Sequence, residues 1–219
     1  YFNKIGADKY HFDTCNETFH RTKMLNYMAL HSDSEIIFNY DADVLLSPVQ
    51  ILYTVYQLRQ KDTDFVYPYN GVFARVPRIH YANLLKNNDV GRLLGNTFKG
   101  EGENDPLSVG GAIAYKKQSF LRAGMENENF ISYGAEDVER KIRFERLMFN
   151  VKRIGGKLYH IDHFIGANSS SRNPHFANNN KEYLKIVALD LVGLCEYIKK
   201  WPWYNNLNKR KEIIKNAYG

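Results

Sequence analysis

Cysteine and long hydrophobic runs are scarce in this sequence. Its two cysteines, Cys15 and Cys195, lie far apart and lack the spacing of metal ligands. This sparse usage makes a reducing, cytosolic compartment the default expectation. No apolar run approaches the roughly 20 residues that span a bilayer, and no signal peptide is recognisable. We therefore expect a cytoplasmic protein.

The sequence also lacks long runs of one charge. Lysine and arginine outnumber the acidic residues and give a formal net charge of +6, but they cluster only at Lys209-Arg210-Lys211. This scattered excess favours phosphate-bearing ligands or an anionic membrane surface over nucleic acid. We expect no nucleic-acid partner, and peripheral contact with the inner face of a membrane is consistent with the charge.

Helices and strands alternate in the first third of the chain. A capping-box pattern at 14–17 precedes apolar residues at helical spacing. A short apolar strand is predicted at 35–40 and another at 64–69. Between them, Ser47-Pro48 predicts the start of a helix. The residues predicted to form the buried stripe of that helix are Val49, Leu52 and Tyr56.

A glycine-containing segment separates this part from the rest. Residues 70–108 lack regular periodicity and are expected to form a functional loop. Within it, residues 96–108 are predicted to be mobile without ligand and to close over a ligand as a lid.

The alternation then resumes. We predict a strand at 112–115, a helix at 136–149 with Val138, Ile142 and Phe149 on one face, and a strand at 158–161. Apolar residues at helical spacing from Tyr183 to Trp201 predict one long C-terminal helix, which Pro202 ends.

This order of elements predicts the fold class. Helices alternating with strands favour an α/β sandwich with a mixed, mainly parallel sheet. A chain of 219 residues suits one domain with a small appendage. We expect a main domain at 1–178 and a helical extension at 179–219.

Two carboxylates follow the first predicted strand, in Asp41-Ala42-Asp43. Ligands of open α/β sheets gather at the carboxyl ends of strands. Paired carboxylates there can hold a divalent cation such as Mn²⁺ or Mg²⁺, which leaves positions open for substrate phosphates. The alternative is an acidic turn that caps the next helix.

A second group combines glycines with acidic residues. Gly110-Gly111 precede a strand, and paired glycines let the backbone approach a ligand closely. Glu136 and Asp137 start a helix, where the dipole stabilises carboxylates and where one of them could act as a general base. Simple helix capping is the alternative.

Histidine and basic residues complete the candidates. His160 and His163 lie three positions apart at a strand end, which places them on opposite faces of a strand and predicts that one of them reaches a given site. A neutral imidazole is a good ligand for Mn²⁺. Arg21 and Lys23 could reach a phosphate, or they could belong to a solvated helix face.

Taken in order, five segments resemble the GT-A fold glycosyltransferases. They are FHRTKMLN, IIFNYDADVLLSP, VGGAIAY, ENFISYGAEDVERKIR and LYHIDH, which together cover about residues 15–170. The similarity is to family 2-like bacterial enzymes, whose C-terminal half is shared with β-1,4-galactosyltransferases and polypeptide N-acetylgalactosaminyltransferases.

The resemblance implies a role for each matched residue. Asp43 would bind the metal directly, and Asp41 would face the nucleotide ribose or the water shell of the metal. Gly110 and Gly111 would line the donor sugar. Asp137 would be the general base of an inverting reaction, with Glu136 beside it. His163, or as second choice His160, would complete the metal site.

The implied activity is that of an inverting, metal-dependent glycosyltransferase. It would move a sugar from a nucleotide-sugar, with UDP-sugar as the expected donor, to a glycan or lipid-linked acceptor in bacterial surface polysaccharide synthesis. The sequence departs from the family at Tyr133, where Trp is usual, and at Ala135, where Gly is frequent. No complete uracil-binding βα unit is recognisable before Thr14, so we expect the first βα unit to be missing or incomplete.

Two other classes of function remain open. A nucleotidyltransferase also uses paired carboxylates on an α/β sheet, but it more typically has a glycine-rich phosphate loop with basic residues near its N-terminus, and none is visible. A non-catalytic binding domain that retains the fold is the third hypothesis.

Overall fold

A computed structural model of the protein describes residues 11, 19–80 and 108–206. The predicted capping box at 14–17 and the predicted lid, apart from its last residue, lie outside these ranges. The described helices are α1 (Arg21–His31), α2 (Pro48–Leu58), α4 (Lys117–Arg122), α5 (Glu136–Arg146), α6 (Phe176–Ala188) and α7 (Leu191–Lys199), with 3₁₀ helices at Arg78–His80 and Ala167–Ser169. The strands are β1 (Ile36–Tyr40), β2 (Val44–Leu45), β3 (Phe65–Tyr67), β4 (Phe73–Val76), β5 (Ala112–Lys116), β6 (Val151–Arg153) and β7 (Leu158–Ile161).

The main sheet has four strands in the order β1-β5-β3-β6. Strand β5 is antiparallel to both of its neighbours, while β3 and β6 are parallel, so β1, β3 and β6 run in one direction. The structure is therefore mixed α/β, which confirms the predicted fold class, although two of the three strand pairings in this sheet are antiparallel rather than parallel.

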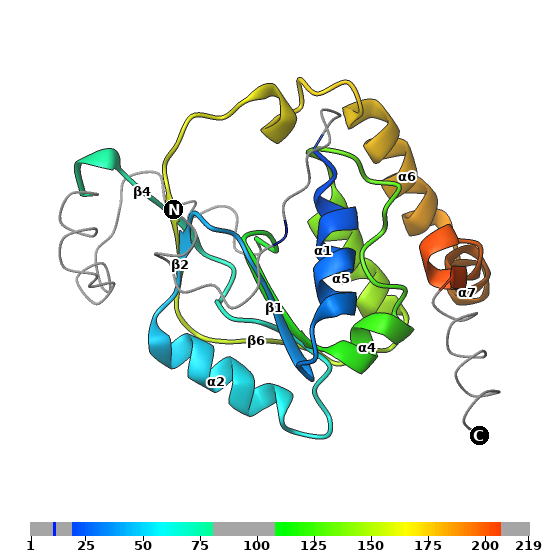
Figure 1. The fold of residues 1–219 in the computed structure, drawn as a ribbon, viewed down its shortest axis with the longest axis horizontal. Helices are drawn as coiled ribbons and strands as arrows, with labels where there is room; N and C mark the ends of the chain where they lie inside the picture. Colours follow the sequence, from blue (N-terminus) through cyan, green and yellow to red (C-terminus); the bar gives the residue numbers. More distant parts are fainter. Residues whose placement is uncertain (1–10, 12–18, 81–107, 207–219) are drawn as a thin grey trace.

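Helices cover both faces of this sheet. In Figure 1, α2 lies on one side of β1, and α1, α4 and α5 lie on the other. Alternate residues of β3 face opposite sides, as expected for a strand. Phe65 and Tyr67 belong to the core cluster that includes Phe144 of α5, whereas Val66 packs with Leu58 of α2. The core thus has two layers, one on each face.

A second, three-stranded sheet has the order β2-β7-β4. Strand β2 is antiparallel to β7 and pairs Val44 with His160, whereas β4 is parallel to β7. This small sheet brings the segment after β1 next to the end of β7. It therefore determines which candidate residues can meet.

The buried face of α2 differs from the prediction. Its start at Ser47-Pro48 is confirmed by a capping box between Ser47 and Gln50. However, the predicted stripe is exposed, because Val49, Leu52 and Tyr56 are 73%, 70% and 57% accessible.

A buried polar side chain explains this rotation of α2. Gln50 is 5% exposed and donates through Nε2 to the carbonyls of Pro68 at 2.8 Å and Lys157 at 3.2 Å. Thr54 is also buried and bonds to the Gln50 carbonyl at 2.7 Å. Because these polar groups find partners inside, the helix turns them inward and leaves apolar residues outside.

The buried face of α5 was also predicted wrongly. The helix ends at Arg146 rather than near 149, and Val138 is exposed. The buried residues are mostly charged: Glu136, Glu139, Arg140, Arg143 and Phe144. The charges of Glu139, Arg140 and Arg143 can be buried because they are paired. Arg143 contacts Glu139 at 2.6 Å, and Arg140 contacts Glu126 at 3.0 Å.

The predicted single C-terminal helix is two helices. Leu189 is extended, and Asp190 then caps α7 by accepting a hydrogen bond from the Gly193 amide at 2.7 Å. Arg146 of α5 donates to the carbonyls of Ile186, Val187 and Leu189 at the end of α6, which satisfies groups that a continuous helix would have bonded itself. The apolar stripe is still used, because Ile186, Leu194, Ile198 and Trp201 form one cluster.

The orientation of α2 can be tested with a matched pair of leucines. Leu58→Ala removes a side chain that is 1% exposed, and we expect the free energy of unfolding to fall by about 2–5 kcal/mol because a cavity remains. Leu52→Ala on the exposed face should change it by less than about 0.5 kcal/mol. Urea unfolding of both variants measures this, and equal losses would contradict the observed face.

Candidate functional site

The segment after β1 is held between two other parts of the chain. The Asp41 amide donates to the Gly111 carbonyl at 2.9 Å, and the Asp41 carbonyl accepts from the Val44 amide at 3.3 Å. The Asp43 carbonyl accepts from the Ile161 amide at 2.8 Å. The acidic turn is therefore fixed by backbone bonds to the glycine pair on one side and to β7 on the other.

Asp43 meets both candidate histidines. Its Oδ2 lies 2.7 Å from His163 Nε2 and 3.5 Å from His160 Nε2. One ligand atom from each of the three residues lies within 4.8 Å of the other two. The prediction that one histidine reaches the site was wrong, because β7 ends at Ile161 and the chain no longer alternates faces at His163.

The donor atoms of this group fit a divalent metal. His163 Nδ1 donates to the Phe164 carbonyl at 2.8 Å, which leaves Nε2 directed at Asp43. Such a bond from the second ring nitrogen is usual in metal-binding histidines, because it fixes the tautomer. Two imidazoles and one carboxylate suit Mn²⁺ better than Mg²⁺, which prefers oxygen ligands and retained water.

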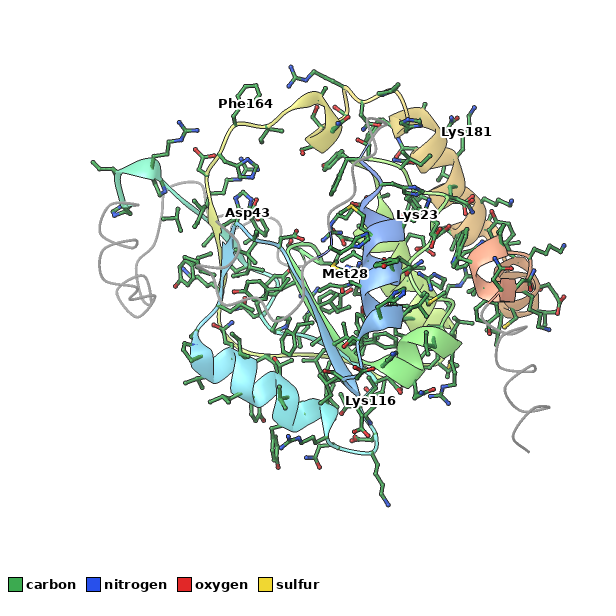
Figure 2. All side chains as sticks on the ribbon, viewed as in Figure 1. Lys23, Met28, Asp43, Lys116, Phe164 and Lys181 are labelled. Carbon is green, nitrogen blue, oxygen red and sulfur yellow. The ribbon has the colours of Figure 1, made fainter. Side chains whose placement is uncertain are left out.

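The environments of the two imidazoles differ. Burial lowers the pKa of His160, which favours the neutral form that binds metal, and its buried Nδ1 has no hydrogen-bond partner. The bond to Phe164 and the nearby Asp43 raise the pKa of His163. Figure 2 labels Asp43, which belongs to this group, and Phe164, which lies on the segment that connects β7 to α6.

Arg21 joins the first carboxylate to the helix start. Its Nη2 contacts Asp41 Oδ1 at 2.8 Å, and its Nη1 contacts Asp137 Oδ1 at 3.3 Å. The same Asp137 oxygen accepts from Arg140 Nη2 at 2.6 Å. Asp41 therefore pairs with a guanidinium group and is not one of the three grouped metal ligands.

The pKa values of Glu136 and Asp137, at the start of α5, are shifted in opposite directions. Burial would raise the pKa of Asp137, but Arg140 and Arg21 outweigh it and hold the pKa below its usual value. Burial and the neighbouring Asp137 raise the pKa of Glu136 to about 8. Glu136 Oε2 is buried and has no hydrogen-bond partner. One carboxyl group is thus kept ionised, and the other holds a proton at neutral pH.

Gly110, two residues before β5, lies close to the start of this helix. A Cβ atom at Gly110 would lie 2.9 Å from Asp137 Oδ2, and Gly111 has a φ of +80° that side chains rarely adopt. Tyr69 donates its hydroxyl hydrogen to the Gly110 carbonyl at 2.7 Å. Asp137 Oδ2, the oxygen that neither arginine contacts, therefore faces the glycine backbone.

The structure also shows residues that sequence reasoning missed. Arg140 supports Asp137 and is bonded to buried Glu126 through Nη1. Arg140 could have been found, because i,i+3 residues share a helix face. Glu126 gives no local signal. Of the predicted phosphate-binding pair, Arg21 bridges two carboxylates, whereas Lys23 is exposed on α1 (Figure 2).

No helix among residues 11, 19–80 and 108–206 is long and apolar enough to cross a membrane. No protein-family model matches the sequence, and no curated protein matches it.

Several solved structures are similar to the chain. The catalytic domain of Drosophila β1,4-galactosyltransferase 7 with xylobiose has a TM-score of 0.43 and 17% identity, over 64% of this chain and 48% of that one. A mutant of that enzyme with manganese, UDP-Gal and xylobiose has a TM-score of 0.44 and 16% identity, over 64% and 48%. A mannosyltransferase from Pyrobaculum calidifontis with GDP-Man and Mn²⁺ has a TM-score of 0.42 and 16% identity, over 90% of this chain and 55% of that one.

The chain spans about half the length of the solved structures it matches. At such low identity and TM-scores the similarity says nothing about the roles of individual residues or about substrates. The solved structures that are similar to the chain are of glycosyltransferases.

Removing a donor atom should weaken metal binding. We expect Asp43→Asn to reduce Mn²⁺ affinity by at least about 10-fold, because one of three converging ligands is lost. Affinity of the unaltered protein should fall as the pH falls through the raised pKa of His163, since His163 must lose its proton to bind metal. Calorimetric titration measures both effects. Asp62→Asn, at an exposed carboxylate, is the control, and equal affinities for the two variants would remove Asp43 from the site.

The raised pKa of Glu136 predicts a pH-dependent stability. The native protein keeps this proton up to about pH 8, whereas the unfolded chain releases it near pH 4.5. The native state binds more protons in this window, so this group makes the protein less stable as the pH rises. Gln does not titrate, so the Glu136→Gln variant lacks this pH dependence. Its free energy of unfolding should therefore rise relative to that of the unaltered protein between about pH 5 and about pH 8, by at most about 1.4 kcal/mol per pH unit. Urea unfolding at both pH values checks this, with Glu145→Gln, an exposed carboxylate on the same helix, as the control.

Proposed function

We propose that this chain is a metal-dependent, inverting glycosyltransferase. It takes a sugar from a nucleotide-sugar, most simply a UDP-sugar, and transfers it to a hydroxyl group of a glycan or lipid-linked acceptor. The observation that carries the proposal is the convergence of Asp43, His160 and His163. Asp41, two residues before Asp43, is joined through Arg21 to Asp137 at the start of α5.

The proposed metal site acts on the leaving group of the reaction, the diphosphate. Asp43, His160 and His163 would hold Mn²⁺, which supplies Lewis-acid stabilisation of a diphosphate. The backbone of Gly110 and Gly111, which carries no side chains, would line the donor sugar.

Glu136 and Asp137 act on the attacking group, the acceptor hydroxyl. As the acceptor oxygen bonds to the anomeric carbon and the bond from that carbon to the diphosphate breaks, the hydroxyl proton must leave. Asp137 is ionised, and its Oδ2 is not engaged by Arg21 or Arg140, so it can accept this proton. Protonated Glu136, with an unpartnered oxygen, can hold the acceptor hydroxyl in place.

Two further parts of the proposal rest on sequence alone. A role in bacterial surface polysaccharide synthesis follows from the family resemblance. A cytoplasmic location, with contact at the inner face of a membrane, follows from sparse cysteine and positive charge.

Replacing the proposed base should separate binding from transfer. We expect Asp137→Asn to keep the affinity for a nucleotide-sugar with Mn²⁺ and to lose transfer activity by about 10²–10⁴-fold. Calorimetry over a panel of nucleotide-sugars, followed by product assays with the tightest donor, measures the two quantities. Thermal unfolding must accompany them, because Asp137 also pairs with two arginines.

The matched control is Glu145→Gln, an exposed carboxylate on α5 paired with Lys141. It should behave like the unaltered protein. If Asp137→Asn turns over at the normal rate, Asp137 only caps the helix, although the metal site could remain. If no nucleotide-sugar binds with Mn²⁺, the glycosyltransferase proposal fails and a nucleotidyltransferase or non-catalytic domain remains.

A further inference from the structure

Two buried asparagines from the C-terminal part of the chain hold the loop that leads into α5. The Tyr133 carbonyl accepts hydrogen bonds from Asn173 Nδ2 at 2.9 Å and from Asn179 Nδ2 at 3.0 Å. These side chains are among the most buried polar groups, with residue exposures of 4% and 1%. Asn173 lies just before α6, and Asn179 lies within it.

Asn179 contacts this loop at Ile131 and Gly134 as well as at Tyr133. Its Oδ1 accepts from the Ile131 amide at 3.2 Å, and its Nδ2 donates to the Ile131 carbonyl at 2.8 Å. The side chain thus pairs with Ile131 as a neighbouring strand would. It also fills the space beside Gly134, where an added Cβ would lie 2.6 Å from Nδ2 and 2.7 Å from the Asn179 Cβ.

The loop needs such support because its backbone is strained. Ser132 has a φ of 62°, in the left-handed region that costs a residue with a side chain roughly 1–2 kcal/mol. It is held by its amide, which donates to the Phe19 carbonyl at 2.9 Å, and by its hydroxyl, which donates to the Asn168 carbonyl at 2.7 Å. A strained turn of this kind persists only where its surroundings determine it.

The start of α5 has no side-chain cap. Its N-cap residue is Ala135, which offers no side-chain cap. Glu136 and Asp137 follow directly, and Asp137 Oδ2 already sits against Gly110 with no room for a Cβ between them. A small shift of the loop would therefore displace both carboxyl groups.

We propose that Asn173 and Asn179 are positioning residues that fix the acidic pair Glu136 and Asp137 for the transfer reaction. The role in transfer rests on the function proposed above, whereas the placement of the carboxyl groups does not. The C-terminal segment is thereby part of the site, although none of its residues needs to touch substrate.

The experiment compares Asn179→Ala with Asn178→Ala, its exposed neighbour on the same helix. The first readout is the carboxyl NMR titration of Glu136. Its surroundings include the charged groups of Asp137, Arg21 and Arg140. Loss of the hydrogen bonds from Asn179 to Ile131 and Tyr133 should let Glu136 move toward solvent. The titration of Glu136 in Asn179→Ala should therefore shift to lower pH.

The second readout is kinetic. With the best nucleotide-sugar and Mn²⁺, kcat of Asn179→Ala should fall on the order of 10–100-fold while the KM for the donor stays unchanged, because misplacement of reacting groups costs rate rather than donor binding. Asn178→Ala should match the unaltered protein in both readouts. Asn173→Ala, which loses one bond to Tyr133 and one to the Ser170 carbonyl, should show the same changes more weakly.

Each outcome decides the inference. If Asn179→Ala and Asn173→Ala melt earlier but keep the Glu136 titration and kcat, the asparagines only stabilise the fold and the proposal is overturned. If Asn179→Ala does not fold, Asn173→Ala decides by the same readouts. If the unaltered protein transfers no sugar but the Glu136 titration shifts, the proposed function fails while the positioning role stands.

Discussion

The site depends on a guanidinium group placed between two carboxylates. Arg21 lies at the start of α1 and contacts both Asp41, which follows β1, and Asp137, which lies on α5. Without this bridge, the acidic turn and the acidic helix start would repel each other at short distance. The arginine therefore allows two segments almost a hundred residues apart to present carboxylates to one place.

The bridge is anchored in the protein interior. Arg140 continues it from Asp137 to Glu126, and this last pair is almost fully buried. Glu126 is held further by the Asn39 side chain at 3.2 Å and, through its backbone amide, by Asn26 at 2.8 Å. Buried charges are costly unless every partner is in place. The same cost makes the arrangement specific, because a shifted helix would leave a charge without its partner.

The sequence predicted some parts of this molecule and not others, for a physical reason. Strand positions such as Ile36–Tyr40, the helix start at Ser47 and the turn at Asp41–Asp43 depend on local preferences, and these could be read directly. The buried faces of α2 and α5 could not, because hydrophobic periodicity assumes that polar residues face water. Gln50 and Arg140 are buried instead, with partners far away in the sequence.

The candidate site shows the same division. Its residue types were found from short motifs, but their partners were not. The second histidine reaches Asp43 because β7 ends two residues before His163, which a strand pattern does not reveal. For Arg21 the sequence left open a phosphate contact or a solvated helix face, and its actual bonds to Asp41 and Asp137 depend on how α1 packs against β1 and α5.

The ion-pair chain also sets the net charge that an anionic ligand would meet. Asp41, Asp137 and Glu126 contribute three negative charges, and Arg21 and Arg140 contribute two positive ones. Glu136 adds none while it remains protonated. The remaining charge of −1, together with that of Asp43, equals in magnitude the charge of one divalent cation. A site composed in this way would be close to neutral once a divalent cation is bound and repulsive to phosphate before, so cation binding would have to precede or accompany that of any phosphate-bearing ligand.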